Sequence, residues 1–237
     1  MNFLILAERR PIFERKPFGV NSADFMIILI TSFSILSYLL GSIPTAIWYG
    51  NVYHSIDIRL HGSGNAGATN TFRVLGKKAG SIVLFVDALK GFLATSLASV
   101  LFYMHQVDWQ TCVTLKIFFG FLAIIGHLLP VFCNFKGGKG VATTLGMVLA
   151  LHPPAALASI LIFLVVFAIS HYVSLGSMVA SILFPVLLSW GVFGPVEPAI
   201  IYFGIFIAVL VVFTHRMNIV RIFKGTENRM YLIPAKK

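Results

Sequence analysis

Long apolar stretches alternate with short polar interruptions along this chain. A helix that crosses a bilayer needs about 20 apolar residues, or fewer where flanking groups reach the interface. The run 141–152 is too short to cross alone, so it predicts a half-helix or a helix that begins inside the preceding loop. The pattern indicates an all-α polytopic integral membrane protein with about seven transmembrane helices. The candidate spans are 24–49, 79–104, 115–133, 141–152, 155–172, 178–193 and 199–214.

Composition supports a single membrane domain. The chain has 237 residues, of which 58% are hydrophobic and 11% charged, and its mean hydropathy is +0.90. A soluble domain carries about twice that charged fraction. We therefore interpret residues 26–237 as one transmembrane domain and residues 1–25 as an N-terminal extension of uncertain role. Met26 opens an apolar run, which leaves Met1 and Met26 as alternative translation starts.

The net charge of +10 comes from cations that lie beside the apolar runs rather than on a solvated face. Membrane lipids and a phosphorylated substrate are therefore better partners than nucleic acid, which we do not expect to bind. Even numbers of predicted spans separate the polar segments, so all of them should share one face. Cation-rich loops favour the cytoplasmic side of the inner membrane, although four cations between residues 9 and 16 oppose this unless the chain starts at Met26. The segments are 61–78, 135–140, 171–177 and 214–229.

The segment FKGGKGVATT (135–144) combines three glycines with a lysine at the predicted start of a helix. Glycine lets backbone N–H groups turn toward an anion, and a helix N-terminus carries partial positive charge. The pattern favours a phosphate site, although a flexible hairpin with two solvated lysines remains the alternative. It does not match the GxxxxGK[ST] loop. The candidate ligands are Gly137, Gly138, Lys139, Gly140 and Thr143.

Short polar side chains fill the preceding segment, GSGNAGATNTFR (62–73). Such side chains suit a tight loop that satisfies its own backbone hydrogen bonds near lipid. Arg73 follows at a spacing that can return its guanidinium to the same site, where its planar fork matches phosphate. The alternative is an interfacial turn with a snorkelling arginine. The polar residues are Ser63, Asn65, Thr69 and Asn70.

The segment THRMNIVR places His215, Asn218 and Arg221 three residues apart, and Glu227 follows. If the last helix continues through them, these side chains share a stripe. His215 can bind phosphate or relay a proton, while a lone interfacial histidine is more often structural. Glu227 can orient His215 or a cation.

Five other residues are weaker candidates. Asp87 and Lys90 lie at i, i+3 inside an apolar run, where they most simply neutralise one another. Ser177 and its neighbour Ser174 are plausible hydroxyl ligands. Cys133 could carry an acyl group, but a buried membrane thiol is the better reading.

Several common catalytic patterns are missing from the sequence. There is no GxSxG, no His followed five residues later by Asp, no CxxC, and no acidic or His/Cys cluster. We therefore expect neither a serine-hydrolase mechanism nor a metal or other cofactor.

Taken together, several ordered motifs resemble the bacterial acyl-phosphate:glycerol-3-phosphate acyltransferases, the PlsY-type family. The resemblance runs from about Ile28 to Glu227. Two departures are mild: Ala66 stands where the family often has another residue, and the extension 1–25 has no family counterpart. The matching motifs are GSIPTA (41–46), GSGNAGATNTFR (62–73), VDALKG (86–91), GHLLPVFCNFKGGKGVAT (126–143), SLGS (174–177) and HRMNIVRIFKGTE (215–227).

The resemblance implies seven membrane helices and transfer of a fatty acyl chain from acyl phosphate to the 1-hydroxyl of glycerol 3-phosphate. Lysophosphatidic acid and inorganic phosphate are the products of this first acylation step of phospholipid synthesis. It also implies functional coupling to the soluble enzyme that makes acyl phosphate. It implies that the glycerol 3-phosphate ligands are Ser63, Arg73, Lys139, Ser177, His215 and Asn218. Catalytic roles would fall to Lys139, Arg73, His215 and Ser63, with Asn65, Thr69, Asn70, Arg221 and Glu227 in support.

Phosphate is already a good leaving group, so an acyl-enzyme step would gain little and we expect direct transfer. The hydroxyl proton would go to His215 or to a phosphate oxygen of the donor. Another class, a transporter or channel for phosphorylated solutes, would also need cationic glycine loops. Against it, the polar segments gather on one face rather than along a path to the midplane. A non-catalytic interaction protein would not need so many phosphate-type residues.

Overall fold

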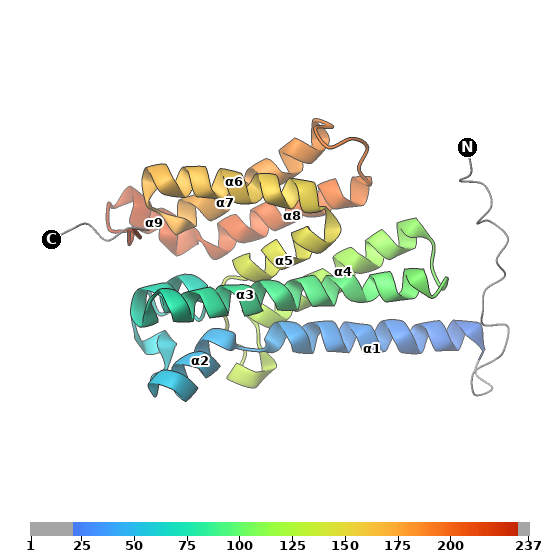
Figure 1. Ribbon diagram of the computed structural model, residues 1–237, viewed down its shortest axis with the longest axis horizontal. Coiled ribbons are helices and arrows are strands. Elements are labelled where there is room, and N and C mark those ends of the chain that lie inside the picture. Colours follow the sequence, from blue (N-terminus) through green and yellow to red (C-terminus); the bar gives the residue numbers. More distant parts are fainter. Residues whose placement is uncertain (1–20, 232–237) are drawn as a thin grey trace.

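The computed structural model describes residues 21–231, which form helices and turns (Figure 1). The segment 1–20, with most of the predicted extension, lies outside the described residues. Two short 3₁₀ turns, η2 (Ile58–Leu60) and η3 (Val131–Cys133), accompany the α-helices. These helices are α1 (Ser22–Ser42), α2 (Thr45–His54), α3 (Ala68–Tyr103), α4 (Trp109–Leu128), α5 (Val141–Leu151), α6 (Pro153–Ser170), α7 (Val173–Ser189), α8 (Pro198–Thr214) and α9 (Arg216–Phe223).

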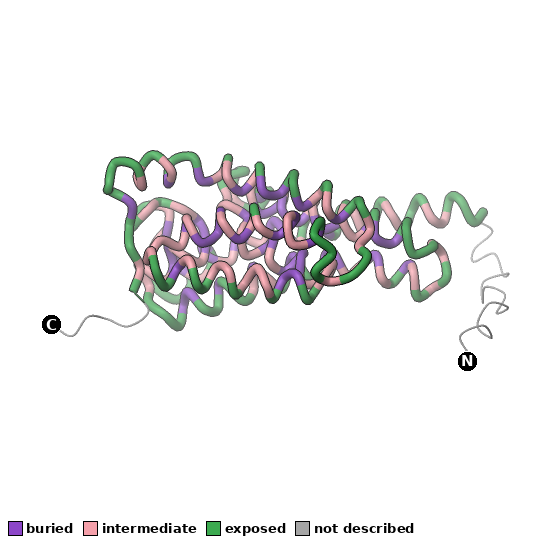
Figure 2. Tube along the Cα trace, turned by 90° about the horizontal axis from the view of Figure 1, so that it is seen from above, coloured by how far each residue is buried: buried purple, intermediate pink, exposed green. Residues whose placement is uncertain are grey.

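The helices form two layers with a short helix between them. Helices α1, α3 and α4 lie on one side and α6, α7 and α8 on the other, while α5 contacts both (Figure 1). Buried residues run along the middle of the bundle, and the outward faces are exposed (Figure 2). An apolar outward face is what a lipid environment requires, because lipid tails replace water around it.

Membrane-spanning character is evident in several helices. Among the described residues, α1, α3, α4 and α6 are long and apolar enough to cross a bilayer. The bent pair α8 and α9 adds a fifth if it is one span. Helices α5 and α7 are shorter, with 11 and 17 residues. The all-helical membrane fold predicted from sequence therefore agrees with the structure, whereas the count of seven spans stays a prediction.

The first predicted span, 24–49, is two helices rather than one. The chain breaks at Ile43 and Pro44, because proline cannot donate the backbone hydrogen bond that a continuing helix needs. At the other end, α1 begins at Ser22, four residues before the predicted domain boundary. The Asn21 side chain accepts a hydrogen bond from Asp24 N at 2.8 Å and caps this start.

Two more helices begin earlier than predicted. Helix α3 begins at Ala68, inside the segment expected to be a loop, and a non-helical Gly76 kinks it (φ 86°, ψ −175°). Thr69, Asn70 and Arg73 therefore lie on its first turns. Helix α7 begins at Val173 rather than at 178, which places Ser177 on a helix instead of in a loop.

The backbones of α3 and α5 touch. A Cβ atom on Gly91 would lie 2.0 Å from the Thr143 carbonyl oxygen, and one on Gly146 would lie 1.8 Å from the Ala88 carbonyl oxygen. Small residues permit such an approach between membrane helices. These contacts hold the first half of α5, which directly follows the glycine loop, against α3.

A buried polar cluster ties α3 to the break after α1. Lys90 Nζ lies 2.9 Å from Asp87 Oδ1, as the sequence predicted, and both side chains are almost fully buried. Lys90 also donates to the Ile43 carbonyl at 2.9 Å, and the Thr45 hydroxyl donates to Asp87 at 2.9 Å. His127 Nδ1 stands 3.8 Å from the same carboxylate. The cluster therefore supplies a donor to the Ile43 carbonyl at the break.

Candidate active site

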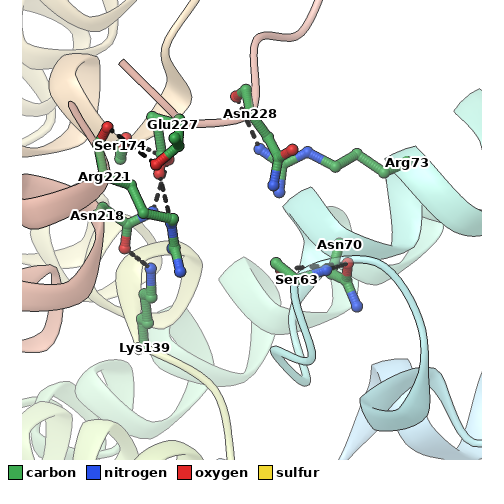
Figure 3. A network of polar contacts seen from close by, with 10 residues as sticks. Ser63, Asn70, Arg73, Lys139, Ser174, Asn218, Arg221, Glu227 and Asn228 are labelled. Atoms are coloured by element: carbon green, nitrogen blue, oxygen red, sulfur yellow. Dashed lines mark hydrogen bonds and ion pairs between the residues drawn. The ribbon is translucent and has the colours of Figure 1, made fainter. Parts of the chain in front are cut away.

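Side chains from the predicted polar segments meet in one network of polar contacts (Figure 3). Lys139, from the glycine loop, donates a hydrogen bond to Asn218 Oδ1 on α9. Arg73, from α3, donates to the Asn228 carbonyl at 3.2 Å. Ser174, from α7, donates to Glu227 at 2.9 Å. The prediction that all four segments share one face therefore agrees with the structure.

Glu227 organises one side of this cluster. Its carboxylate accepts hydrogen bonds from Asn218 Nδ2 at 2.7 Å, Arg221 Nε at 2.8 Å and the Ser174 hydroxyl. Burial raises the pKa of Glu227, but the bonds from Arg221, Asn218 and Ser174 outweigh burial and hold the pKa below its ordinary value. Because Asn218 gives its amide N–H to Glu227, its carbonyl oxygen is oriented toward Lys139.

Cations outnumber carboxylates in the cluster. Lys139, Arg73 and Arg221 surround the single carboxylate of Glu227. Burial lowers the pKa of Lys139 to about 8, Glu227 opposes this change, and the two arginines add to it. Within the described part of the chain, the Arg73 Nε atom is buried without a hydrogen-bond partner. An oxyanion at this place would supply the missing acceptor and negative charge.

The glycine loop differs from our expectation. Gly137 N donates to the Leu128 carbonyl and Gly138 N to the His127 carbonyl, each at 3.2 Å. Those two N–H groups are therefore engaged by the end of α4 and are not turned toward an anion. The N–H groups that helix geometry leaves unpaired are those of the first turn of α5, after Gly140. Lys139 lies directly before that turn.

Thr143, expected to be a phosphate ligand, does not face the cluster of Figure 3. Its side chain is fully buried on α5, at the contact with α3, and its hydroxyl has no hydrogen-bond partner among the described residues. The reason is the close approach at Gly91, which turns this part of α5 toward α3.

Asn70 builds the loop 61–67 rather than facing a ligand. Its Oδ1 accepts from Ser63 N at 2.8 Å and the Ser63 hydroxyl at 3.2 Å, while Nδ2 donates to the carbonyls of Ile58 and His61 at 3.0 Å each. The loop therefore satisfies its own hydrogen bonds, as the short polar side chains predicted. Asn65 and Thr69 are half-buried in the same region.

His215 ends α8, and the chain turns by 58° into α9. The last helix therefore does not continue straight through THRMNIVR. The buried imidazole donates from Nδ1 to the Val211 carbonyl at 2.8 Å, since a carbonyl can only accept. In the neutral ring this hydrogen bond leaves Nε2 without a proton, as an acceptor.

One contributor to the cluster was named in the sequence only as a weaker candidate, and another was missed. Ser177, the serine expected to bind glycerol 3-phosphate, is buried and donates to the Val173 carbonyl of its own helix at 2.9 Å, whereas Ser174 donates to Glu227. Their three-residue spacing gave no reason to prefer one over the other. The Asn228 carbonyl that holds Arg73 is a backbone group, so no side-chain pattern marks it.

Comparison with known proteins decides the family. The model of the family described as glycerol-3-phosphate acyltransferase matches residues 31–225. The chain belongs to the glycerol-3-phosphate acyltransferase family. The resemblance found in the sequence motifs is thus confirmed. A relative of this name from Enterococcus faecalis is 44% identical over 212 residues, covering 86% of this chain and 93% of the relative. One from Chlorobaculum tepidum is 41% identical over 218 residues, covering 83% and 94%.

Solved structures of the family share the fold. The crystal structure of PlsY, an integral membrane glycerol 3-phosphate acyltransferase, in its glycerol 3-phosphate form is similar with a TM-score of 0.72 at 38% identity. The similarity covers 85% of this chain and 96% of that one. The lysophosphatidic acid form of PlsY gives a TM-score of 0.70. Membership in a family of integral membrane acyltransferases supports the membrane fold described above.

Proposed function

We propose that this chain transfers a fatty acyl group from acyl phosphate to the 1-hydroxyl of sn-glycerol 3-phosphate. The products are 1-acyl-glycerol 3-phosphate and inorganic phosphate, in the first acylation step of phospholipid synthesis. The solved PlsY structures, in glycerol 3-phosphate and lysophosphatidic acid forms, support this choice of acceptor and product.

The observation that carries the proposal is the cationic cluster around Lys139 and Arg73. Each substrate brings a phosphate, and the half-buried guanidinium and ammonium groups offer donors and positive charge for both. As the acyl–oxygen bond breaks, negative charge builds on the departing phosphate. Donors aimed at such charge lower the barrier, each contributing about 100-fold to 1000-fold in rate. The first turn of α5 adds its free N–H groups beside Lys139.

Positioning supplies the rest of the catalysis. The acceptor hydroxyl attacks the carbonyl carbon, a new C–O bond forms, and the phosphate leaves with the electron pair of the broken bond. The hydroxyl proton goes to Nε2 of His215 or to an oxygen of the leaving phosphate. One observation favours the imidazole as acceptor, since its Nδ1–H is already engaged and Nε2 is left to accept a proton. The positive charge of nearby Lys139 opposes a second positive charge on the ring and so favours the phosphate oxygen. We propose Ser63, Ser177 and Asn218 as further ligands of glycerol 3-phosphate.

Direct transfer needs no nucleophilic side chain and no metal, because the donor is activated and cations are supplied by the chain. Cys133 lies in η3, six residues before Lys139. The charged groups near its thiol are Arg59 and Asp57, which pair with each other at 2.6 Å, so neither is free to activate it. We further propose seven membrane helices, a cytoplasmic-facing site in the inner membrane, and supply of acyl phosphate by a soluble enzyme.

The test uses the purified protein in lipid with palmitoyl phosphate, glycerol 3-phosphate and no added metal. Phosphate and lysophosphatidic acid should form in equal amounts, and palmitoyl-CoA should be inert as donor. A folded protein that makes no product, yet moves glycerol 3-phosphate across vesicles, would instead be a transporter. Equal activity with palmitoyl-CoA would refute the assignment of acyl phosphate as the donor.

A further inference from the structure

Helix α9 has two different faces. Its inner face carries Asn218, which is buried in the site, and Ile219 and Ile222, which pack against the core. Its outer face carries Met217, Val220 and Phe223, and their exposed fractions are 58%, 44% and 87%. A helix this short and this apolar outside is not stable in water alone, so something must cover the outer face.

The outer face is continuous with the lipid-facing surface of α8. Val209 and Phe213 on α8 are 64% and 62% exposed, and Arg216 lies over the Phe213 ring with its guanidinium carbon 4.9 Å from the centroid. The 58° bend then takes α9 out of the direction of α8. Where α8 points through the membrane, such a turn lays α9 along the membrane surface.

Cations flank the apolar stripe of α9. Arg216 precedes it and Lys224 follows it, and both side chains are exposed. The helix contains no acidic residue, and the nearest acid in sequence, Glu227, is buried and bound to Arg221. Apolar residues between exposed cations are the pattern of helices that lie in the interface of an anionic membrane.

We propose that the outer face of α9 lies in the headgroup layer and binds anionic phospholipid, and that this contact holds the inner face in the active site. The same eight residues carry Asn218, which accepts from Lys139, and Arg221, which binds Glu227. Movement of α9 on the membrane surface therefore moves the ligands of the site. Lipid composition acts on catalysis through this helix.

The first experiment measures where α9 lies and does not depend on the proposed function. Spin labels are placed at Met217→Cys and Phe223→Cys in a chain whose half-exposed cysteine is replaced, Cys133→Ala; the remaining cysteine, Cys112, is buried. Accessibility to oxygen should exceed accessibility to a water-soluble nickel chelate in vesicles of phosphatidylglycerol. Phe85→Cys, on the exposed face of α3, and Thr226→Cys serve as membrane and aqueous references. Labels on α9 that behave like Thr226→Cys would overturn the proposal.

The second experiment rests on the proposed function, since it measures acyl transfer. Rates are compared at saturating substrate, because an anionic surface also repels anionic substrates. One cation near an anionic surface contributes about a fivefold factor, so kcat should rise at least about fivefold from phosphatidylcholine to phosphatidylglycerol vesicles. The double variant Arg216→Gln, Lys224→Gln should lose this rise and keep the activity seen in phosphatidylcholine.

A matched control is Lys116→Gln, which removes a cation from the first half of α4, a helix that begins at the end of the bundle remote from α9 (Figure 1). It should leave the lipid dependence intact. Equal kcat in the two lipids, or loss of the dependence in Lys116→Gln as well, would overturn the link between α9 and lipid. A chain that is inactive in every lipid but whose α9 labels are lipid-exposed would count against the proposed function alone.

Discussion

Gly137→Ala tests how the glycine loop works. The added Cβ atom would lie 2.0 Å from the His127 carbonyl oxygen, 2.7 Å from Pro130 Cδ and 2.8 Å from the Leu128 carbonyl oxygen. Two of these neighbours are backbone atoms at the end of α4, so they cannot rotate away. The backbone of Gly137 is not in the left-handed region, so the effect of alanine comes from contact alone.

The magnitude follows from the shortfall in distance. Carbon and carbonyl oxygen atoms approach to about 3.3 Å, so the loop must move away from α4 by about 1 Å. The movement breaks the bond from Gly137 N to Leu128 and displaces Lys139, two residues on. A misplacement of about 1 Å costs about 100-fold in rate, and overpacking costs about 1–3 kcal/mol of stability. We expect kcat/KM to fall about 100-fold while the protein still folds.

The assay is phosphate release with palmitoyl phosphate and glycerol 3-phosphate, beside a thermal unfolding curve. The control is Gly67→Ala, in the other glycine-rich loop. Gly67 has extended backbone (φ −153°), and its nearest neighbour is the flexible end of Asn65 at 3.0 Å. That variant should stay within about threefold of the parent. Wild-type kcat/KM in folded Gly137→Ala would refute the account of the loop as an element held rigidly on α4.

Four further outcomes follow from the site. Lys139→Ala and Arg73→Ala should nearly abolish turnover and leave the folded fraction unchanged, as judged by size-exclusion chromatography; parental kinetics in either would refute the phosphate site. Because burial lowers the pKa of Lys139 to about 8, its positive charge is lost as pH rises through that value, so kcat/KM should decline there, and Lys139→Arg should remove the decline from the pH profile. Ser174→Ala takes one of three hydrogen bonds from the buried Glu227 carboxylate and should lower the free energy of unfolding by about 1–3 kcal/mol in a denaturant titration. Cys133→Ala and Cys133→Ser should keep full activity, and loss of activity in a folded variant would point to an acyl-cysteine route.

The chemistry of the site could be predicted from the sequence because side chains, rather than backbone groups, provide most of it. Lys139, Arg73 and Asn218 stand in polar interruptions of an apolar chain, where charge is costly and therefore informative. The buried ion pair of Asp87 and Lys90 could be predicted for the same reason. The membrane class follows from hydropathy, since few other structures can hold so many apolar residues.

Other features could not be read from one sequence, because they depend on backbone geometry in three dimensions. The engagement of Gly137 and Gly138 by α4 carbonyls comes from a close approach between segments. The start of α3 at Ala68 was not predicted, because glycine and small polar residues have low helix propensity. Tertiary packing overrides that propensity here. The bend between α8 and α9 could not be predicted, because no proline or glycine lies next to His215 in the sequence.

The contact between Lys90 and the Ile43 carbonyl has a consequence for the order in which the chain assembles in the bilayer. Inserted by itself, α1 ends at a break where the Ile43 carbonyl accepts only from Thr45 N, at 3.0 Å, and its second lone pair has no donor. The donor that satisfies it sits on α3, which is made later and brings Asp87 along as its own counter-ion. The shape of the first helix pair is therefore completed only when the second long helix has entered the membrane and docked.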